Sequence, residues 1–145
     1  MKILVINGPN LNFLGIREKA VYGEESYASL IARIEKKAEQ DGDTVECFQS
    51  NHEGAIIDRI QTAYSDGTDG IVINPGAYTH YSYAIHDALK SIEGIPKVEV
   101  HISDIQAREE FRRVSVTAQA CDRQIVGHGL DGYAEAMDLI RELRT

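Results

Sequence analysis

The sequence feature that most constrains the fold is an alternation between short apolar runs and segments with helical periodicity. The runs that are typical of strands are Ile3–Ile6, Thr44–Phe48, Gly70–Ile73, Val98–Ile102 and Arg123–Val126. Between and after them, apolar residues recur every three or four positions in Ser26–Gln40, Ala55–Tyr64, Tyr81–Ile92 and Tyr133–Leu143. Strands without polar alternation are buried on both faces, so strands that alternate with helices predict a parallel sheet covered on both sides.

This order predicts an α/β fold, namely a doubly wound, flavodoxin-like sheet of five parallel strands. The length of 145 residues suits a single domain spanning residues 1–145, and no repeat or linker interrupts the pattern. In such sheets, ligands bind beyond the carboxyl ends of the strands. The loops expected at that edge are Asn7–Asn12, Gln49–His52, Asn74–Gly76, His101–Asp104 and Gly127–Gly129. They are rich in amide, hydroxyl and imidazole groups, so we expect the functional site there.

Charge and composition limit the class of partner. The net charge of −8 argues against a nucleic-acid partner, because phosphate binding requires a basic surface. The apolar part of the N-terminal segment MKILVI is too short for a signal peptide or a membrane span, so a cytoplasmic protein without a membrane partner is expected. Cys47 and Cys121 form no CxxC pair and are expected to be reduced, buried thiols.

Two motifs that suggest cofactors are weak signals. The stretch GHGLDG at Gly127–Gly132 matches GxGxxG, but no strand and acidic residue follow to complete a dinucleotide site. We favour close packing of a helix on a strand there, with a nucleotide-using enzyme as the less favoured alternative. His80 and His86 are six residues apart and do not share a helix face. We therefore expect no metal and no cofactor.

Two other features suggest acid–base chemistry. His101 lies near the carboxyl end of an apolar strand, a place suited to proton transfer. Arg17 and Tyr22 lie in a long segment before the first helix. They fit either a solvated loop or a functional pair, because a phenol acts as a base at neutral pH only when a cation stabilises its phenolate. The segment REEFRR at Arg108–Arg113 fits either a helical turn with i,i+4 charge pairs or anion recognition.

Several stretches together resemble the type II 3-dehydroquinate dehydratases, also called type II dehydroquinases. The matching stretches are INGPNLNFLGIRE followed by YG, FQSNHEGAIID, INPGAYTHYSYAIHDAL, VEVHIS and REEFRRVS, with GHGLDGY similar to the closing glycine-rich turn. The first five blocks span the chain from Ile6 to Ser115 in the family's order. The resemblance implies dehydration of 3-dehydroquinate, a small anionic polyol, to 3-dehydroshikimate through an enolate, without metal or cofactor.

The resemblance also implies roles for individual residues. Tyr22 corresponds to the base that removes a proton beside the ketone, Arg17 to the residue that favours the tyrosinate, and His101 to the acid that protonates the departing hydroxyl. Asn10 corresponds to an amide that orients the acid or a water near the enolate oxygen. The implied substrate contacts are Asn74, His80, Asp87, Ile102, Ser103 and Arg112. In the family, the aspartate at Asp87 reaches a neighbouring subunit's site, which implies a homo-oligomer, a dodecamer built from trimers.

Four positions depart from the family pattern. Lys19 replaces a usual proline, His86 a common arginine, Asp104 a common asparagine and His128 a common phenylalanine. These positions concern a possible lid and the subunit contacts rather than the catalytic residues. A noncatalytic module that binds a small anion is the alternative function, and the coexistence of the three acid–base candidates argues against it. The sequence does not decide between aromatic biosynthesis and quinate breakdown.

Overall fold

The computed structural model describes all residues 1–145 and contains the predicted sheet. The strands are β1 (Lys2–Asn7), β2 (Thr44–Gln49), β3 (Gly70–Asn74), β4 (Lys97–His101) and β5 (Arg123–Val126). They are ordered β2-β1-β3-β4-β5, and every neighbouring pair is parallel. This is the doubly wound order of flavodoxin-like folds, so the predicted fold class is confirmed.

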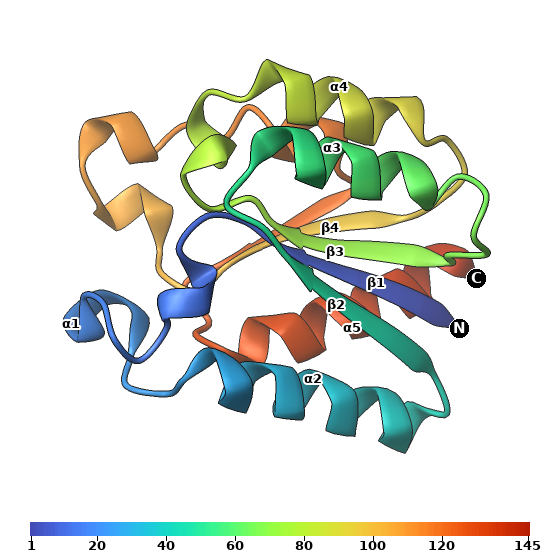
Figure 1. Cartoon of the computed structure of the whole chain (residues 1–145), viewed down its shortest axis with the longest axis horizontal. Coiled ribbons are helices and arrows are strands. Elements are labelled where there is room, and N and C mark those ends of the chain that lie inside the picture. The colour runs from blue at the N-terminus through green and yellow to red at the C-terminus, as the bar shows by residue number, and fades with distance from the viewer.

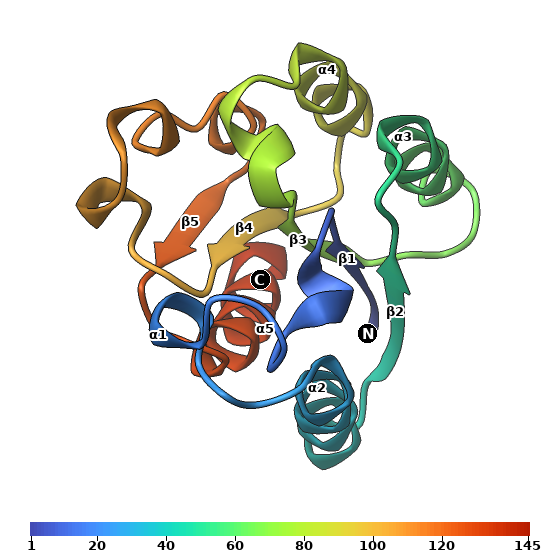
Figure 2. The ribbon, with the colours of Figure 1, turned by 60° about the vertical axis from the view of Figure 1, so that its left-hand side comes forward.

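Helices cover both faces of the sheet (Figures 1 and 2). One face carries α2 (Tyr27–Asp41) and α5 (Asp131–Arg144), and the other carries α3 (Glu53–Thr62) and α4 (Tyr83–Ser91). The single turn α1 (Lys19–Tyr22) lies apart, at the carboxyl edge of the sheet. The short 3₁₀ turns are η1 (Leu11–Phe13), η2 (Gly76–His80), η3 (Ile105–Ala107), η4 (Glu110–Arg112) and η5 (Ala118–Ala120).

The central strands explain why both faces need cover. In β1, Ile3 and Val5 pack with the cluster under α2 and α5, whereas Leu4 and Ile6 pack with the cluster under α3 and α4. All four side chains are at most 1% exposed. Each such side chain stabilises the fold by about 1.5–3 kcal/mol relative to exposure, so an unbroken apolar strand requires helices on both sides.

Helix boundaries follow the capping residues. Helix α2 begins after Ser26, whose hydroxyl accepts the Ser29 N–H at 3.1 Å, and ends at Gly42, as the pattern predicts. Helix α4 begins at Tyr83, two residues later than predicted, because the Ser82 hydroxyl accepts the Ile85 N–H at 3.0 Å. The other helix and strand ends coincide with the predicted ones or differ from them by one or two residues.

The loops after β1 and β3 are held in contact by two glycines. The Gly8 N–H donates to the Asn74 carbonyl at 2.7 Å. A Cβ on Gly8 would come within 2.4 Å of the Pro75 carbonyl oxygen. Gly76 has a φ of +62° and would place a Cβ 3.0 Å from the Pro9 carbonyl oxygen. The two loops can therefore approach this closely only because both positions are glycine.

Helix α5 packs on the sheet after the glycine-rich turn, but this packing does not depend on glycine at Gly132. A Cβ there would lie 3.4 Å from Ile125 of β5 and 3.6 Å from Val100 of β4, which is ordinary van der Waals contact. No helix is long and apolar enough to cross a membrane.

Both cysteines are free, as predicted, but they are only partly buried. Cys47 lies on β2, at the edge of the sheet, where one side of the strand has no neighbour. Burial still raises the pKa of the Cys47 thiol to about 12, and it raises the pKa of Cys121 as well. Neither thiol is therefore a nucleophile at neutral pH.

Candidate active site

A pocket opens at the carboxyl edge of the sheet, with an empty volume of about 660 Å³ including its mouth. Its walls come from the loops after β1, β3 and β4 and from the segment that contains α1 (Figure 2). The predicted site residues that line it are Asn10, Arg17, Tyr22, Asn74, His80, His101, Ile102, Ser103 and Arg112. These residues are far apart in sequence, and the parallel topology brings them together because all three strands end at this edge.

Asn10 lies in the loop after β1 and lines the pocket. Its backbone is in the left-handed conformation, with a φ of 69°. Asparagine tolerates this region better than most residues with a side chain. The Asn10 N–H donates to the Asn51 side-chain oxygen at 3.0 Å, and the Gln49 amide donates to the same oxygen at 3.1 Å. Neighbouring loops thus fix the backbone that carries Asn10.

The Tyr22 hydroxyl lies between two guanidinium groups. Its oxygen accepts from Arg108 Nη1 at 2.7 Å and from Arg17 Nη2 at 3.3 Å. The guanidinium carbons of Arg17 and Arg108 also lie 4.5 Å and 5.2 Å from the centroid of the tyrosine ring. Two guanidinium groups thus contact one phenol, so Arg17 and Tyr22 lie in the contact that a functional pair requires.

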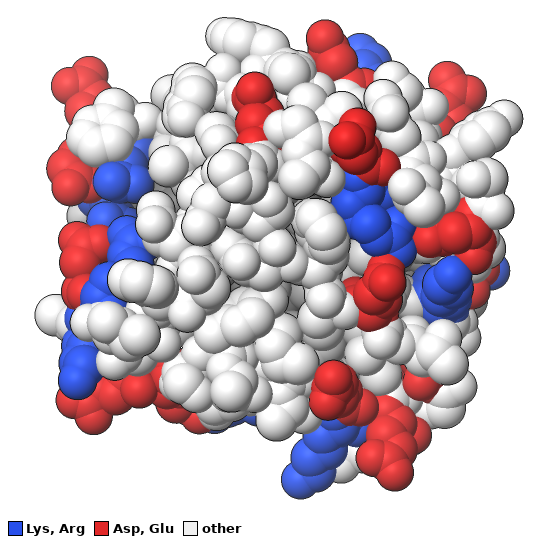
Figure 3. All heavy atoms as spheres, viewed as in Figure 1, with Lys and Arg blue, Asp and Glu red and all other residues white.

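Acidic side chains accompany these arginines at the pocket rim. Glu18 pairs with Arg17 at 2.8 Å, and Glu109 pairs with Arg112 at 2.9 Å. Figure 3 shows basic and acidic side chains interleaved at the left edge of the view, beside a broad uncharged central area. Of the two interpretations of REEFRR, the helical turn with charge pairs is present in part: η4 is a 3₁₀ turn, and its ion pair is i,i+3 rather than i,i+4.

His101 is held by a buried carboxylate. Its Nε2 lies 2.9 Å from Glu99 Oε2, and Glu99 has no exposed surface. Burial raises the pKa of Glu99, but the bonds from His101, Thr117 and Ser115 outweigh it, so the net pKa lies below the ordinary value. Glu99 is therefore a carboxylate, and it holds the His101 ring in place through this bond. The other ring nitrogen of His101 remains available to the pocket.

The His80 ring is bound to a backbone carbonyl rather than to a carboxylate. Its Nδ1 donates to the Val114 carbonyl at 2.7 Å. Burial, together with the charges of His101 and Arg112, lowers the pKa of His80, although the bond to Val114 opposes this. His80 is thus neutral near pH 7, with a proton on Nδ1 and a lone pair on Nε2. It can accept a hydrogen bond from a hydroxyl group in the pocket.

Ile102 and Ser103 each have a backbone N–H without an acceptor within the protein. Their carbonyls accept from Gly129 and Gly127, each at 3.1 Å, so the glycine-rich turn after β5 supports this loop. Both residues line the pocket, as does Arg112. Free N–H groups and a guanidinium are donors of the kind that bind a carboxylate.

Asp87 is the one predicted site residue that does not line the pocket. It lies on α4, exposed to solvent, and its carboxylate has no hydrogen bond or ion pair within the chain. Near it on the same segment, Tyr81 and Tyr83 are 59% and 69% exposed. This exposed face of α4 therefore combines an acidic group with two aromatic rings.

Two residues of the site were missed by the sequence reasoning. Arg108 was assigned only to the REEFRR group, because nothing in the sequence links it to Tyr22, 86 positions away. Glu99 does carry a signal. It is two residues before His101 on one strand, so the two side chains point to the same face. No group of three or more histidine, cysteine or acidic residues is placed to hold a metal ion.

Comparison with known proteins agrees with this site. A model of the family "Dehydroquinase class II" matches residues 1–141. A 3-dehydroquinate dehydratase of Lachnoclostridium phytofermentans is 69% identical over 97% of this chain and 96% of its own. One of Lachnospira eligens is 64% identical over 99% of this chain and 97% of its own.

Solved structures give the same picture. The crystal structure of type II dehydroquinase from Butyrivibrio crossotus superposes with a TM-score of 0.97 at 64% identity, covering 97% of each chain. The sheet order, the pocket residues and these matches along nearly the whole length lead to one conclusion: the chain belongs to the class II dehydroquinase family.

Proposed function

We propose that this chain dehydrates 3-dehydroquinate to 3-dehydroshikimate, with Tyr22 as base and His101 as acid. The family and the names of its relatives support the reaction. One observation carries the mechanism: a single pocket contains a phenol flanked by two guanidinium groups and an imidazole backed by a carboxylate. These are two groups whose surroundings favour opposite states, one as a base and the other as an acid.

The first step is proton removal. Tyr22, as the phenolate stabilised by Arg17 and Arg108, takes a proton from the carbon beside the ketone. The electrons of the broken C–H bond form an enolate, whose negative charge moves onto the former ketone oxygen. Such a proton is only weakly acidic, so the enolate oxygen needs hydrogen-bond donors. The Asn10 amide, directly or through a water, provides one from the loop after β1.

The second step is loss of the hydroxyl group. The charge on the enolate oxygen re-forms the ketone, the electrons of the enolate double bond form the new carbon–carbon double bond of the enone, and the C–O bond breaks. His101 donates its proton to the departing oxygen, so that water leaves. Glu99 keeps the charged imidazole stable before the transfer, because the carboxylate lies 2.9 Å from its ring. Tyr22 then carries the abstracted proton and His101 lacks one. Exchange with solvent restores both residues.

Substrate binding uses the remaining walls of the pocket. The substrate carboxylate fits the free N–H groups of Ile102 and Ser103. Its hydroxyl groups fit the neutral nitrogen of His80, the Asn74 amide and the Arg112 guanidinium. All these groups are short or fixed by their own hydrogen bonds, so they bind a rigid polyol with little loss of side-chain freedom.

A direct assay tests the reaction. Chelator-treated protein is mixed with 3-dehydroquinate, and the ultraviolet absorbance of the conjugated enone is followed. A rising trace that stays unchanged on adding divalent metal is expected. Folded protein that binds the compound without forming the enone would instead indicate the noncatalytic binding module.

The oligomer is part of the same proposal. We expect trimers, associated into a dodecamer in the cytoplasm, in which Asp87 completes a neighbouring pocket. Its unpaired carboxylate and the exposed rings near it support this arrangement. The reaction would place the enzyme in aromatic biosynthesis or in quinate breakdown.

Mixed subunits test the shared site. Tyr22→Phe and Asp87→Ala subunits, each weakly active alone, should regain part of the activity after subunit exchange, because some interfaces then pair an intact Tyr22 with an intact Asp87. Sedimentation of a fully active monomer would exclude the shared site.

A further inference from the structure

Four buried or partly buried polar side chains form a hydrogen-bonded chain that begins at the pocket and ends at α2. Apart from Asn74, the proposed mechanism does not use them. The chain links Asn74 of β3, Tyr133 of α5, Asn7 of β1 and Tyr27 of α2. Tyr133 is 1% exposed, Asn7 0% and Asn74 4%. Buried polar groups are costly unless each is satisfied, so this chain has to be explained.

The direction of every hydrogen bond in this chain is fixed. The Gly76 N–H can only donate, so the Asn74 atom that faces it at 3.2 Å is the oxygen. The Asn74 amide nitrogen then faces Tyr133 and donates to its hydroxyl oxygen at 3.0 Å. Tyr133 has one proton, which goes to the Asn7 side-chain oxygen at 2.6 Å.

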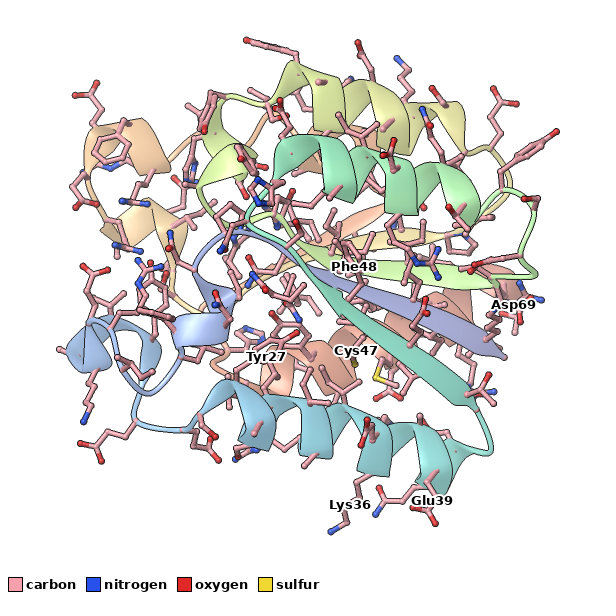
Figure 4. The ribbon with its side chains drawn as sticks, in the orientation of Figure 1. Tyr27, Lys36, Glu39, Cys47, Phe48 and Asp69 are labelled. Carbon is pink, nitrogen blue, oxygen red and sulfur yellow. The ribbon has the colours of Figure 1, made fainter.

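The last hydrogen bond of this chain joins Asn7 to Tyr27. The Asn7 amide nitrogen donates to the Tyr27 hydroxyl at 3.4 Å. Figure 4 shows Tyr27 on α2 beside Cys47 of β2, both pointing into the layer between that helix and the sheet. Reversing the Asn74 amide would place its nitrogen against the Gly76 N–H, so that two donors would face each other.

We propose that Tyr133 is a positioning residue for substrate binding, which acts by fixing the orientation of the Asn74 amide. Asn74 is the one member of this buried chain that lines the pocket. With one amide hydrogen given to Tyr133 and the oxygen given to Gly76, Asn74 keeps a second amide hydrogen. That hydrogen is a fixed donor for a substrate oxygen. This inference rests on the proposed function.

Removing the Tyr133 hydroxyl tests it. Tyr133→Phe keeps the ring between α5 and the sheet but leaves the Asn74 side chain held only through its oxygen, by the Gly76 N–H. KM for 3-dehydroquinate should rise about three- to tenfold, the range expected for one hydrogen bond, with kcat within about twofold of the wild type. Tyr27→Phe is the matched control. It removes a hydroxyl at the other end of the chain and should change KM less than about twofold.

A double-mutant cycle separates positioning from a general structural role. In an Asn74→Ala background, Tyr133→Phe should have almost no further effect on KM, because no amide remains to be oriented. An equal rise of KM in both backgrounds would overturn the inference, and so would an unchanged KM in Tyr133→Phe alone. Wild-type protein that forms no enone would overturn the proposed function instead, and this inference with it.

Discussion

The two proton-transfer groups of the pocket are held in very different ways. Tyr22 ends a one-turn helix on a connecting segment and is surrounded by long, partly exposed arginine side chains. His101 ends a central strand, is 5% exposed, and is bound to a carboxylate with no exposed surface. The phenol is in contact with charged side chains from connecting segments, whereas the imidazole belongs to a buried hydrogen-bond network inside the sheet.

The base and the acid need different surroundings, and different parts of the fold provide them. The base needs a charge environment, and arginines from separate loops can provide one only after those loops come together. The acid needs a partner that keeps its proton at a fixed position, which a buried strand neighbour provides continuously. Changes at the base should therefore affect activity with little effect on stability, and changes at the acid should affect both.

The largest expected effect is that of Tyr22→Phe. The variant loses the proton acceptor and keeps the ring, so kcat should fall by about 10²–10⁴-fold, the usual contribution of a positioned proton transfer. Its melting temperature should match the wild type. Steady-state kinetics and a thermal melt give both values. Near wild-type turnover would rule out Tyr22 as the base.

His101→Ala should reduce kcat by a similar factor but should also destabilise the fold. Removal of the imidazole takes one hydrogen bond from a fully buried carboxylate, at a cost of about 1–3 kcal/mol. Ser115, Thr117 and Gln124 still bind Glu99, so the protein should fold. If this variant melts at the wild-type temperature, the contrast between the two groups is wrong.

Arg108→Met should have an intermediate effect. The guanidinium that lies 2.7 Å from the phenol is lost, while Arg17 remains. A hydrogen bond to a charged group contributes about 1.5–3 kcal/mol, so kcat should fall roughly ten- to a hundredfold. Arg123→Met, on the exposed end of β5, is the matched control and should leave kcat unchanged. Equal kcat values for the two variants would argue against a role for Arg108 beside Tyr22.

The stability of the fold at acid pH tests the buried network around His101 and Glu99. The pKa of Glu99 is lowered from its ordinary value of 4.5, so the unfolded chain binds more protons than the folded one as pH falls. The stabilisation is complete above about pH 4.5 and is lost as pH drops through the folded-state pKa. Urea titrations between neutral and acid pH should show a shallower loss of stability for Glu99→Gln. An identical slope would mean that another carboxylate controls acid unfolding.

The smallest expected effect concerns the segment Leu14–Gly23, which we propose as a lid over the bound substrate. We expect trypsin to cut after Arg17 or Lys19 in the free protein and a bound substrate analogue to slow the cleavage. Gly15 and Gly23, with φ values of 83° and 87°, are the positions where the backbone can turn most easily. Cleavage at the same rate with saturating analogue would contradict a lid.

Much of the fold was readable from local sequence. Unbroken apolar strands and helical periodicity identified the five strands and four of the helices, because burial on one or two faces leaves a pattern within a few residues. The turn α1 was not identified, since four residues carry no periodicity. Helix α4 was placed two residues early, because its start depends on which serine side chain turns back to cap it.

The sequence by itself determined the parallel sheet, its functional edge and, through resemblance, most of the residues that line the pocket. Only the tertiary structure decided that Arg108 reaches Tyr22 and that Tyr133 binds Asn74. The physical reason is distance along the chain. Periodicity and capping act over a few residues, whereas hydrogen bonds between residues 59 or 86 positions apart depend on how the loops and layers meet.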